Sequence, residues 1–239
     1  MTATTEKSQA FWRGVKAGTP FLFVVGPFAL LFGVLASEAG LSVFVALTFS
    51  FVVVAGAAQF TALQLMSENA PTLIVLISAL AVNLRMAMYS ASLTPYLGEA
   101  PLWQRALAAY FIQDQAYACS IIEFEARPKL SVAERMSFFV GSLIPVIPAW
   151  YVLTFLGAAI GRQIPDSWAL DFALPITFIA MLGPMMRTIP HVIAAFVSVV
   201  VSILAAGIPY SLGLLIAGTI AMVAGARAEL FFEQRKNSS

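Results

Sequence analysis

Long runs of apolar residues, separated by short polar linkers, fill most of the chain. Each run approaches or exceeds the ~20 residues that a membrane-spanning helix needs. The runs lie at 19–37, 41–66, 71–97, 102–122, 133–160, 168–186, 189–207 and 209–231. This pattern predicts an all-α fold, a polytopic transmembrane helical bundle of seven or eight spans, within a single domain over residues 19–231.

The two ends of the chain lie outside these runs. Residues 1–18 place Phe11, Trp12 and Val15 among Arg13 and Lys16. This mixture predicts an amphipathic segment at the cytoplasmic surface of the membrane. Residues 232–239 are polar and predict a cytoplasmic tail.

The composition is that of an integral membrane protein. The chain has 239 residues, of which 60% are hydrophobic and 10% charged, whereas a soluble domain carries about 25% charged residues. The net charge of +1 comes without a basic tract, so no nucleic-acid partner is expected. Cys119 and His191 are the only residues of their types, which excludes a zinc site, haem pair or iron–sulfur cluster built from several His or Cys ligands.

Enzymatic chemistry finds no support in the motifs. The sequence has no Walker A, HExxH or GxSxG pattern. We therefore expect a protein that is not an enzyme and binds no cofactor.

Proline and glycine interrupt two of the apolar runs. The first run holds Pro20 and Gly33, and the fifth holds Pro145 and Gly157. Proline removes a helical hydrogen bond, so both runs are expected to be kinked or discontinuous. Broken helices at matching places in two halves are typical of transporters. An internal repeat and the ordinary abundance of these residues in membrane helices both remain open.

Basic residues favour one side of the predicted bundle. With the N-terminus inside, the outer linkers hold only Arg105 and Arg162. The inner side collects ten basic residues: Lys7, Arg13, Lys16, Arg127, Lys129, Arg135, Arg187, Arg227, Arg235 and Lys236. This positive-inside bias predicts eight spans and cytoplasmic termini.

The run at 71–97 carries an arginine at its centre. Arg85 there costs about 2.5–3.5 kcal/mol on insertion scales. Helical spacing places Arg85, Tyr89 and Ser92 on one face, with Asn83 beside it. Either Arg85 and Asn83 line a substrate path, or Arg85 is a buried structural residue satisfied by carbonyls and a carboxylate.

The run at 102–122 holds the matching carboxylate, Asp114, near its middle. A short linker makes this run an antiparallel neighbour of 71–97, so Asp114 and Arg85 are expected at similar depth. Tyr110 and Tyr117 are expected on the same face as Asp114. Asp114 is a candidate proton carrier; the alternative is an interfacial helix that does not span.

The run at 41–66 contains the sequence GAAQF, in which Gly56 permits close helix packing and Gln59 adds an amide. Together with NLR in NLRMAMYSASLTP, YFIQDQAY and the proline-rich fifth run, this motif resembles the AzlC family. These proteins are the large subunits of branched-chain amino acid exporters. The resemblance covers roughly residues 14–229.

The resemblance implies a multi-pass plasma-membrane transporter that works with a small hydrophobic AzlD-like subunit. It implies proton-coupled export of leucine, isoleucine, valine and often methionine. Gly56, Gln59, Asn83, Arg85 and Asp114 match positions of the family motifs. Gln115 departs from them, because relatives often have glutamate there, and Met86 replaces a frequent histidine or aromatic residue.

The residues and the resemblance together favour a carrier. In this hypothesis Arg85 binds the substrate carboxylate, Asn83 and Gln59 add hydrogen bonds, Tyr89 lines the path, and Asp114 meets the ammonium group or carries the proton. The alternatives are an accessory or scaffold membrane subunit and a transporter of a different small solute.

Overall fold

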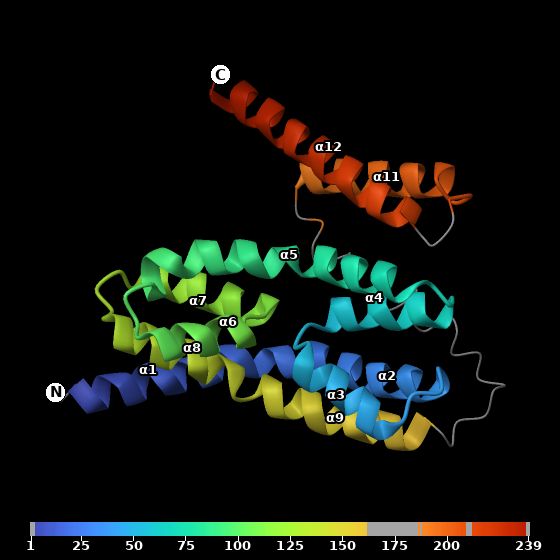
Figure 1. Cartoon of the computed structure of the whole chain (residues 1–239). Coiled ribbons are helices and arrows are strands. Elements are labelled where there is room, and N and C mark those ends of the chain that lie inside the picture. The colour runs from blue at the N-terminus through green and yellow to red at the C-terminus, as the bar shows by residue number, and fades with distance from the viewer. Residues whose placement is uncertain (1–2, 162–185, 187, 209–211, 238–239) are drawn as a thin grey trace. The chain divides into compact units, whose positions relative to one another are not determined.

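The computed structural model describes residues 3–161, 186, 188–208 and 212–237. Every regular element in these ranges is helical, which confirms the all-α prediction (Figure 1). The predicted run at 168–186 lies outside the described residues except for Met186. The described residues form two compact units.

Unit 1 comprises the described residues of Met1–Phe60 and Val82–Trp168, and unit 2 those of Thr61–Ala81 and Ala169–Ser239. The helices, in chain order, are α1 (Ala3–Gly18), the 3₁₀ turn η1 (Thr19–Phe21), α2 (Leu22–Glu38), α3 (Val43–Val52), α4 (Gly56–Ser67), α5 (Thr72–Leu97), α6 (Leu102–Phe111), α7 (Asp114–Ala126), α8 (Val132–Leu143), α9 (Val146–Gly161), α11 (Ile189–Leu204) and α12 (Leu212–Asn237).

Three stretches of the described chain are long and apolar enough to cross a membrane: Thr5–Glu38, Thr72–Leu97 and Val132–Gly161. The first joins α1, η1 and α2. α1 continues through η1 into α2, and Ala10 in α1 is fully buried. The predicted role of residues 1–18 as an amphipathic segment at the cytoplasmic surface stays a prediction.

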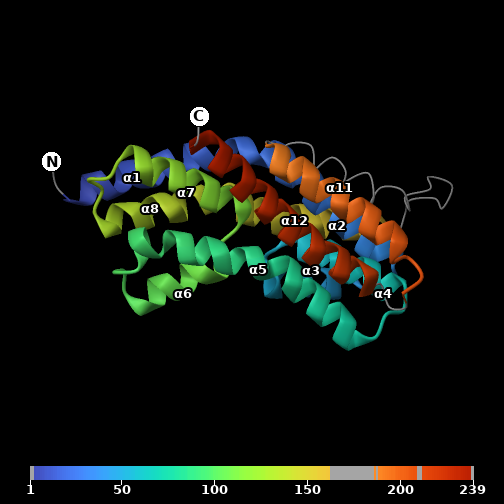
Figure 2. The same ribbon diagram turned by 90° about the horizontal axis from the view of Figure 1, so that it is seen from above.

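Glycines bring the first and third of these stretches into backbone contact. A Cβ atom at Gly14 would overlap the carbonyl oxygen of Phe138, and one at Gly33 would overlap that of Thr154. Small residues allow such close approach between membrane helices. Consequently α1 packs along α8 (Figure 2), and α2 packs along α9 (Figure 1).

Glycines of α8 and α9 make the equivalent contacts with the backbone of α1 and α2. A Cβ atom at Gly141 would overlap Phe11, 127 residues before Phe138, and one at Gly157 would overlap Leu30, 124 residues before Thr154. The two long helices are thus parallel and related by a local two-fold arrangement. This reciprocity favours the internal repeat, at least for this pair of helices.

The run predicted as one span at 41–66 is two short helices. α3 has 10 residues, about 15 Å of helix, and ends where Val53 becomes extended at φ −121° and ψ 91°. After the non-helical residues Val53–Ala55, the amide of Gln59 reaches back to the Val53 carbonyl at 2.7 Å. Figure 1 shows the start of α4, whose residues Gly56–Phe60 belong to unit 1, running back from the end of α3, so the chain reverses within unit 1.

A second reversal replaces the predicted span at 102–122. Ile112 and Gln113 are extended and separate α6 from α7. Contacts between α5 and α7 advance in the same direction along both helices, from Arg85–Asp114 to Tyr96–Phe124. α7 is therefore parallel to α5, and the antiparallel prediction was wrong. The chain reverses after α6, halfway along the predicted span, so α7 runs in the opposite direction to α6.

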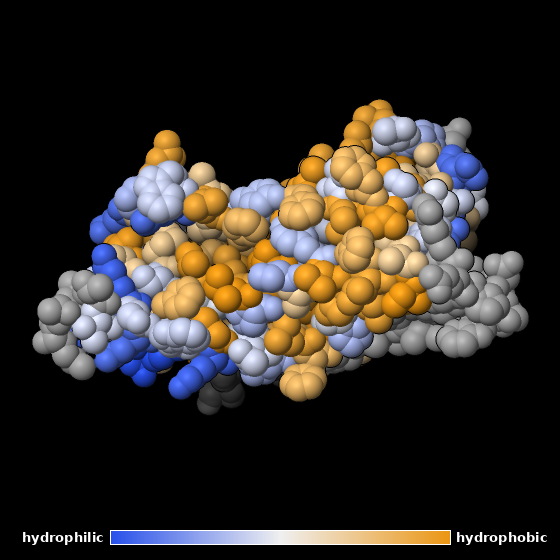
Figure 3. All heavy atoms as spheres, turned by 90° about the horizontal axis from the view of Figure 1, so that it is seen from below, coloured by the Kyte–Doolittle hydropathy of each residue, from blue (hydrophilic) through white to orange (hydrophobic). Residues whose placement is uncertain are grey.

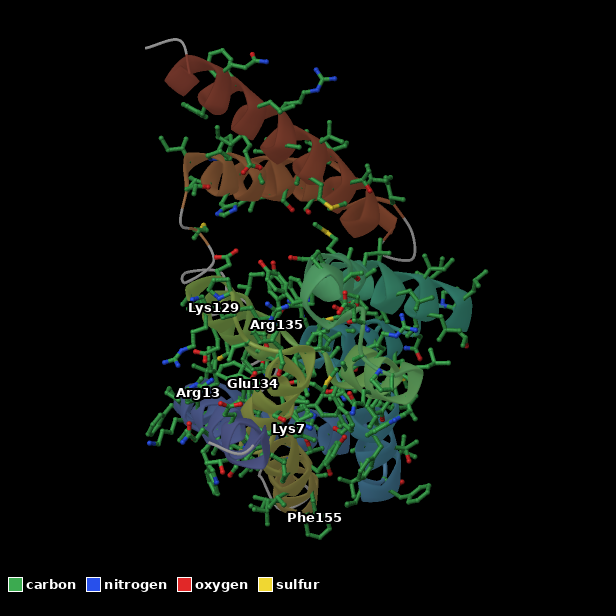
Figure 4. The ribbon with its side chains drawn as sticks, turned by 90° about the vertical axis from the view of Figure 1, so that its left-hand side faces the viewer. Lys7, Arg13, Lys129, Glu134, Arg135 and Phe155 are labelled. Atoms are coloured by element: carbon green, nitrogen blue, oxygen red, sulfur yellow. The ribbon has the colours of Figure 1, made fainter. Side chains whose placement is uncertain are left out.

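The second reversal also moves Arg105. Gln104 beside it lines the same groove as Lys7, so α6 begins at the end of unit 1 where α1 begins. Arg105 consequently joins the basic end of unit 1 and does not lie on the opposite side. Figure 3 shows hydrophilic residues gathered toward this end, and Figure 4 looks onto it, with Lys7, Arg13, Lys129 and Arg135 labelled.

Side-chain interactions hold this basic end together. Arg13 Nε donates to Glu123 Oε1 at 2.8 Å, which ties α1 to α7. Arg135 lies over the ring of Tyr96 and donates to the Pro128 carbonyl. A capping box between Ser131 and Glu134 starts α8.

Unit 2 contains the pair α11 and α12. Thr188 precedes α11, whose first turn contains Pro190. Gly225 of α12 lies close to Ala194 of α11, with a Cβ-to-Cβ separation of 3.1 Å for an added methyl group. α11, with 16 residues, is shorter than the ~20 residues of a full span.

We expect Gly157→Leu to destabilise unit 1, because the new side chain would overlap the Leu30 backbone. Overpacking of this kind costs about 1–3 kcal/mol or more. The melting temperature of the purified protein in detergent should fall by several degrees. Gly218→Ala is the matched control, since nothing lies within 4 Å of its added Cβ. Equal melting temperatures for the two variants would contradict the backbone contact.

Single cysteines introduced into a Cys119→Ser background test the second reversal. Leu102→Cys and Lys129→Cys should be labelled by an impermeant thiol reagent from the same side of the membrane, because α6 begins and α7 ends at one end of unit 1. Ala39→Cys should be labelled from the other side. Labelling of Leu102→Cys and Lys129→Cys from opposite sides would restore the single span at 102–122.

Candidate functional site

An ion pair joins the centre of α5 to the start of α7. Arg85 Nη1 lies 3.0 Å from Asp114 Oδ2, with side-chain exposures of 22% and 43%. The sequence predicted this pairing. Coulombic attraction grows as water is excluded, and a pair costs less at membrane depth than two separate charges.

Two tyrosines extend the pair into a polar cluster. Tyr89 Oη donates to Asp114 Oδ1 at 2.8 Å, and its ring stacks on Tyr117 with centroids 4.3 Å apart. Tyr117 Oη shares a hydrogen bond of 3.1 Å with Ser92 Oγ. Arg85, Tyr89 and Ser92 thus face α7 together, as their helical spacing predicted.

The second reversal explains where Asp114 lies. Asp114 is the first residue of α7, and the preceding residue, Gln113, offers no side-chain cap. The partial positive charge at a helix N-terminus stabilises a nearby carboxylate. Asp114 is therefore held by a helix end, an arginine and a phenol at once.

Two polar atoms of α5 have no partner within the described residues. Arg85 Nε and Asn83 Oδ1 are both buried and accept or donate no hydrogen bond there. Arginine carries five N–H donors, so the contact with Asp114 leaves capacity for a second anion. Buried polar groups of this kind favour a site that is completed by a ligand or water.

Gln59 belongs to a separate buried cluster at the first reversal. Ser50 Oγ accepts hydrogen bonds from Trp150 Nε1 at 3.1 Å and from Gln59 Nε2 at 3.4 Å, and it lies 3.4 Å from Thr154 Oγ1. Gln59 is 1% exposed, and its Oε1 has no partner among the described residues. The cluster anchors the break between α3 and α4 to α9.

Gly56 has a packing role in this cluster. A Cβ atom at Gly56 would approach Trp150 Cη2 to 2.8 Å. The absence of a side chain therefore leaves room for the indole that donates to Ser50.

The two reversals lie close to each other inside unit 1. Tyr110 Oη, at the end of α6, donates to the Phe51 carbonyl near the end of α3. Val54 and Ile112, one from each break, belong to the same buried apolar cluster. Tyr110 thus joins the two breaks and does not share the face of Asp114 and Tyr117, because α6 and α7 are separate helices.

Part of the site was not predicted from the sequence. The sequence pattern did not single out Trp150 and Thr154, because both residue types are common in apolar runs and neither is charged. Their spacing of four residues on one helical face was the available signal. Among the described residues, no group of three or more His, Cys, Asp or Glu side chains could hold a metal ion.

Comparison with known proteins covers the part of the chain that holds both reversals. A family model described as "AzlC protein" matches residues 20–164. An uncharacterized membrane protein of Archaeoglobus fulgidus is 28% identical over 185 residues, which are 76% of this chain and 78% of that protein. The inner membrane protein YgaZ of Escherichia coli (strain K12) is 25% identical over 181 residues, 73% of each chain.

An uncharacterized membrane protein of Helicobacter pylori (strain 26695) is 29% identical over 153 residues, 64% of this chain and 65% of its own. No solved structure matches the chain. The family match extends over more than half of the sequence, from α2 through α9. The protein is therefore a membrane protein that belongs to the AzlC family.

Proposed function

We propose that this protein is the carrier subunit of an exporter for branched-chain and other apolar amino acids. The ion pair of Arg85 and Asp114 between a membrane-depth helix and a half-helix end is the observation that carries the proposal. Charged residues inside membrane spans are costly and mark substrate or ion pathways. Transporters place such sites at discontinuous helices.

The chemistry of the pair suits a zwitterion. An amino acid presents a carboxylate and an ammonium group on one carbon, which complement Arg85 and Asp114 respectively. The substrate would replace the direct contact between these two side chains with one contact to each. The unpartnered Arg85 Nε adds a donor for the substrate carboxylate. Asn83 lies two residues before Arg85, about 200° away around α5, so its unpartnered Oδ1 faces another side of the helix.

Proton coupling follows from competition at Asp114. The substrate ammonium group binds the ionised Asp114 carboxylate while the substrate carboxylate binds Arg85. A proton from outside neutralises Asp114 and so releases the substrate, and the empty carrier gives up that proton on the cytoplasmic side. The same carboxylate thus couples export to the proton gradient in our proposal, although Gln115 removes the second acidic side chain that relatives often have.

The setting in the cell is part of the proposal. The basic end of unit 1, with the N-terminus, would face the cytoplasm by the positive-inside rule. The C-terminus, which carries Arg235 and Lys236, would lie in the cytoplasm by the same rule. A relative is named an inner membrane protein, in agreement with a plasma-membrane location. A small hydrophobic AzlD-like subunit would complete the transporter.

Efflux from proteoliposomes tests the role of the ion pair. With labelled leucine inside and a proton gradient imposed, Arg85→Ala should lower the efflux rate at least tenfold, because the substrate carboxylate loses its counter-ion. Arg105→Ala, at the basic end, is the matched control and should retain the wild-type rate. Size-exclusion profiles must show that both variants are folded.

Asp114→Asn separates the carrier from a scaffold. A carrier that couples through this carboxyl should lose gradient-driven efflux while the protein remains folded and retains any copurifying small subunit. If the folded variant loses the small subunit, and the fraction of complex that stays intact exports at the wild-type rate, the result would favour the accessory role. Full gradient-driven export by both Arg85→Ala and Asp114→Asn would overturn the proposed mechanism.

Tyr89→Phe keeps the ring that stacks on Tyr117 but removes the donor to Asp114. A hydrogen bond to a charged group contributes about 1.5–3 kcal/mol. We therefore expect the rate of gradient-driven efflux to fall roughly tenfold. Tyr96→Phe on the same helix is the control and should leave efflux unchanged. Identical rates for the two variants would remove Tyr89 from the site.

A further inference from the structure

A groove of about 540 Å³ lies between α1, α6, α8 and α9 in unit 1. Its deeper walls are apolar and come from three helices and the start of α9. The residues that form them include Phe11, Leu107, Phe111, Leu143, Ile144 and Ile147. None of these residues belongs to the ion-pair site.

The second reversal explains why the groove exists. α6 ends at Phe111, whereas α8 and α9 continue past it to Gly161. The wall of the groove runs from Ala133 to Pro148, about 22 Å at 1.5 Å per residue. An apolar groove of this length, at the side of a helical hairpin that stops halfway, has the length and chemistry that suit a lipid acyl chain.

The mouth of the groove has a different chemistry. Lys7 is the charged residue among those described that line the groove, and Gln104 and Ser137 add polar groups. Trp103 at the same end is 63% exposed, as is common for an aromatic residue at the headgroup level of a membrane. The polar mouth and apolar interior match the two parts of a phospholipid.

Lys7 supplies a full positive charge to the groove lining. α1, α6 and α8 all begin at this end, but Glu6 lies in the first turn of α1 and Glu134 closes the capping box of α8. The N-terminus of α6, which has no side-chain cap, therefore adds the uncompensated partial positive charge. Basic pockets between membrane helices on the cytoplasmic side bind anionic headgroups.

From this arrangement we propose that the groove binds an anionic phospholipid, with its phosphate at Lys7 and one acyl chain along α8 toward Pro148. The lipid fills the space that α6 leaves beside α8, and it stabilises the hairpin of α6 and α7 that carries Asp114. This site is independent of the proposed transport function.

Native mass spectrometry of the purified, delipidated chain tests the site, with phosphatidylglycerol and phosphatidylcholine offered at equal concentration. The wild type should retain phosphatidylglycerol preferentially. Lys7→Gln should reduce this preference about fivefold, which corresponds to about 1 kcal/mol for one basic residue near the surface. Lys16→Gln, an exposed lysine of the same helix outside the groove, should retain the preference.

Filling the groove tests the acyl chain. Ser137→Phe and the milder Ala108→Leu should both reduce retention of the two lipids, and Ala108→Leu guards against misfolding of the larger variant. Equal lipid preference in Lys7→Gln and Lys16→Gln, or unchanged retention in both filled variants, would overturn the proposal. Displacement of the lipid by a bound small hydrophobic subunit would also overturn it, because the groove would then belong to that subunit.

Discussion

Backbone contact between the two long helices supports the rest of unit 1. Gly14 and Gly141 let α1 lie against α8, and Gly33 and Gly157 let α2 lie against α9. Both short-helix hairpins pack on this platform, α3 against α9 and α7 against α8. A larger side chain at any of these glycines would push apart surfaces that position Ser50, Asp114 and their partners.

The membrane imposes a second constraint on this platform. Non-helical backbone at membrane depth must find partners within the protein. The first reversal meets this need through Gln59, whose amide donates to the Val53 carbonyl, and through Trp150 on α9. The second reversal instead begins a helix with Asp114 and balances that charge with Arg85. One break is closed by neutral hydrogen bonds, whereas the other is closed by a pair of opposite charges.

Hydrophobic patterning revealed the class of fold and the charged residues, but it did not reveal chain direction. The run at 102–122 is apolar enough to be counted as a span, and only the polar sequence Gln113–Gln115 marks the place where it reverses. Length alone could not show whether α7 is parallel or antiparallel to α5, since Arg85 and Asp114 reach the same depth in both cases. The contribution of Trp150 and Thr154 depended on tertiary contacts between residues 100 or more positions apart, which periodicity does not report.

The short 3₁₀ turn η1 keeps the two long helices in phase. Gly14 and Gly33 are 19 residues apart, whereas their counterparts Gly141 and Gly157 are 16 apart, a difference of three residues. A 3₁₀ helix has three residues per turn, so the three residues of η1 add one whole turn. The first helix is longer than its counterpart, yet Gly33 still points in the direction required for contact with α9. Removal of all three residues would preserve this direction, whereas removal of one or two would rotate α2 away from its partner.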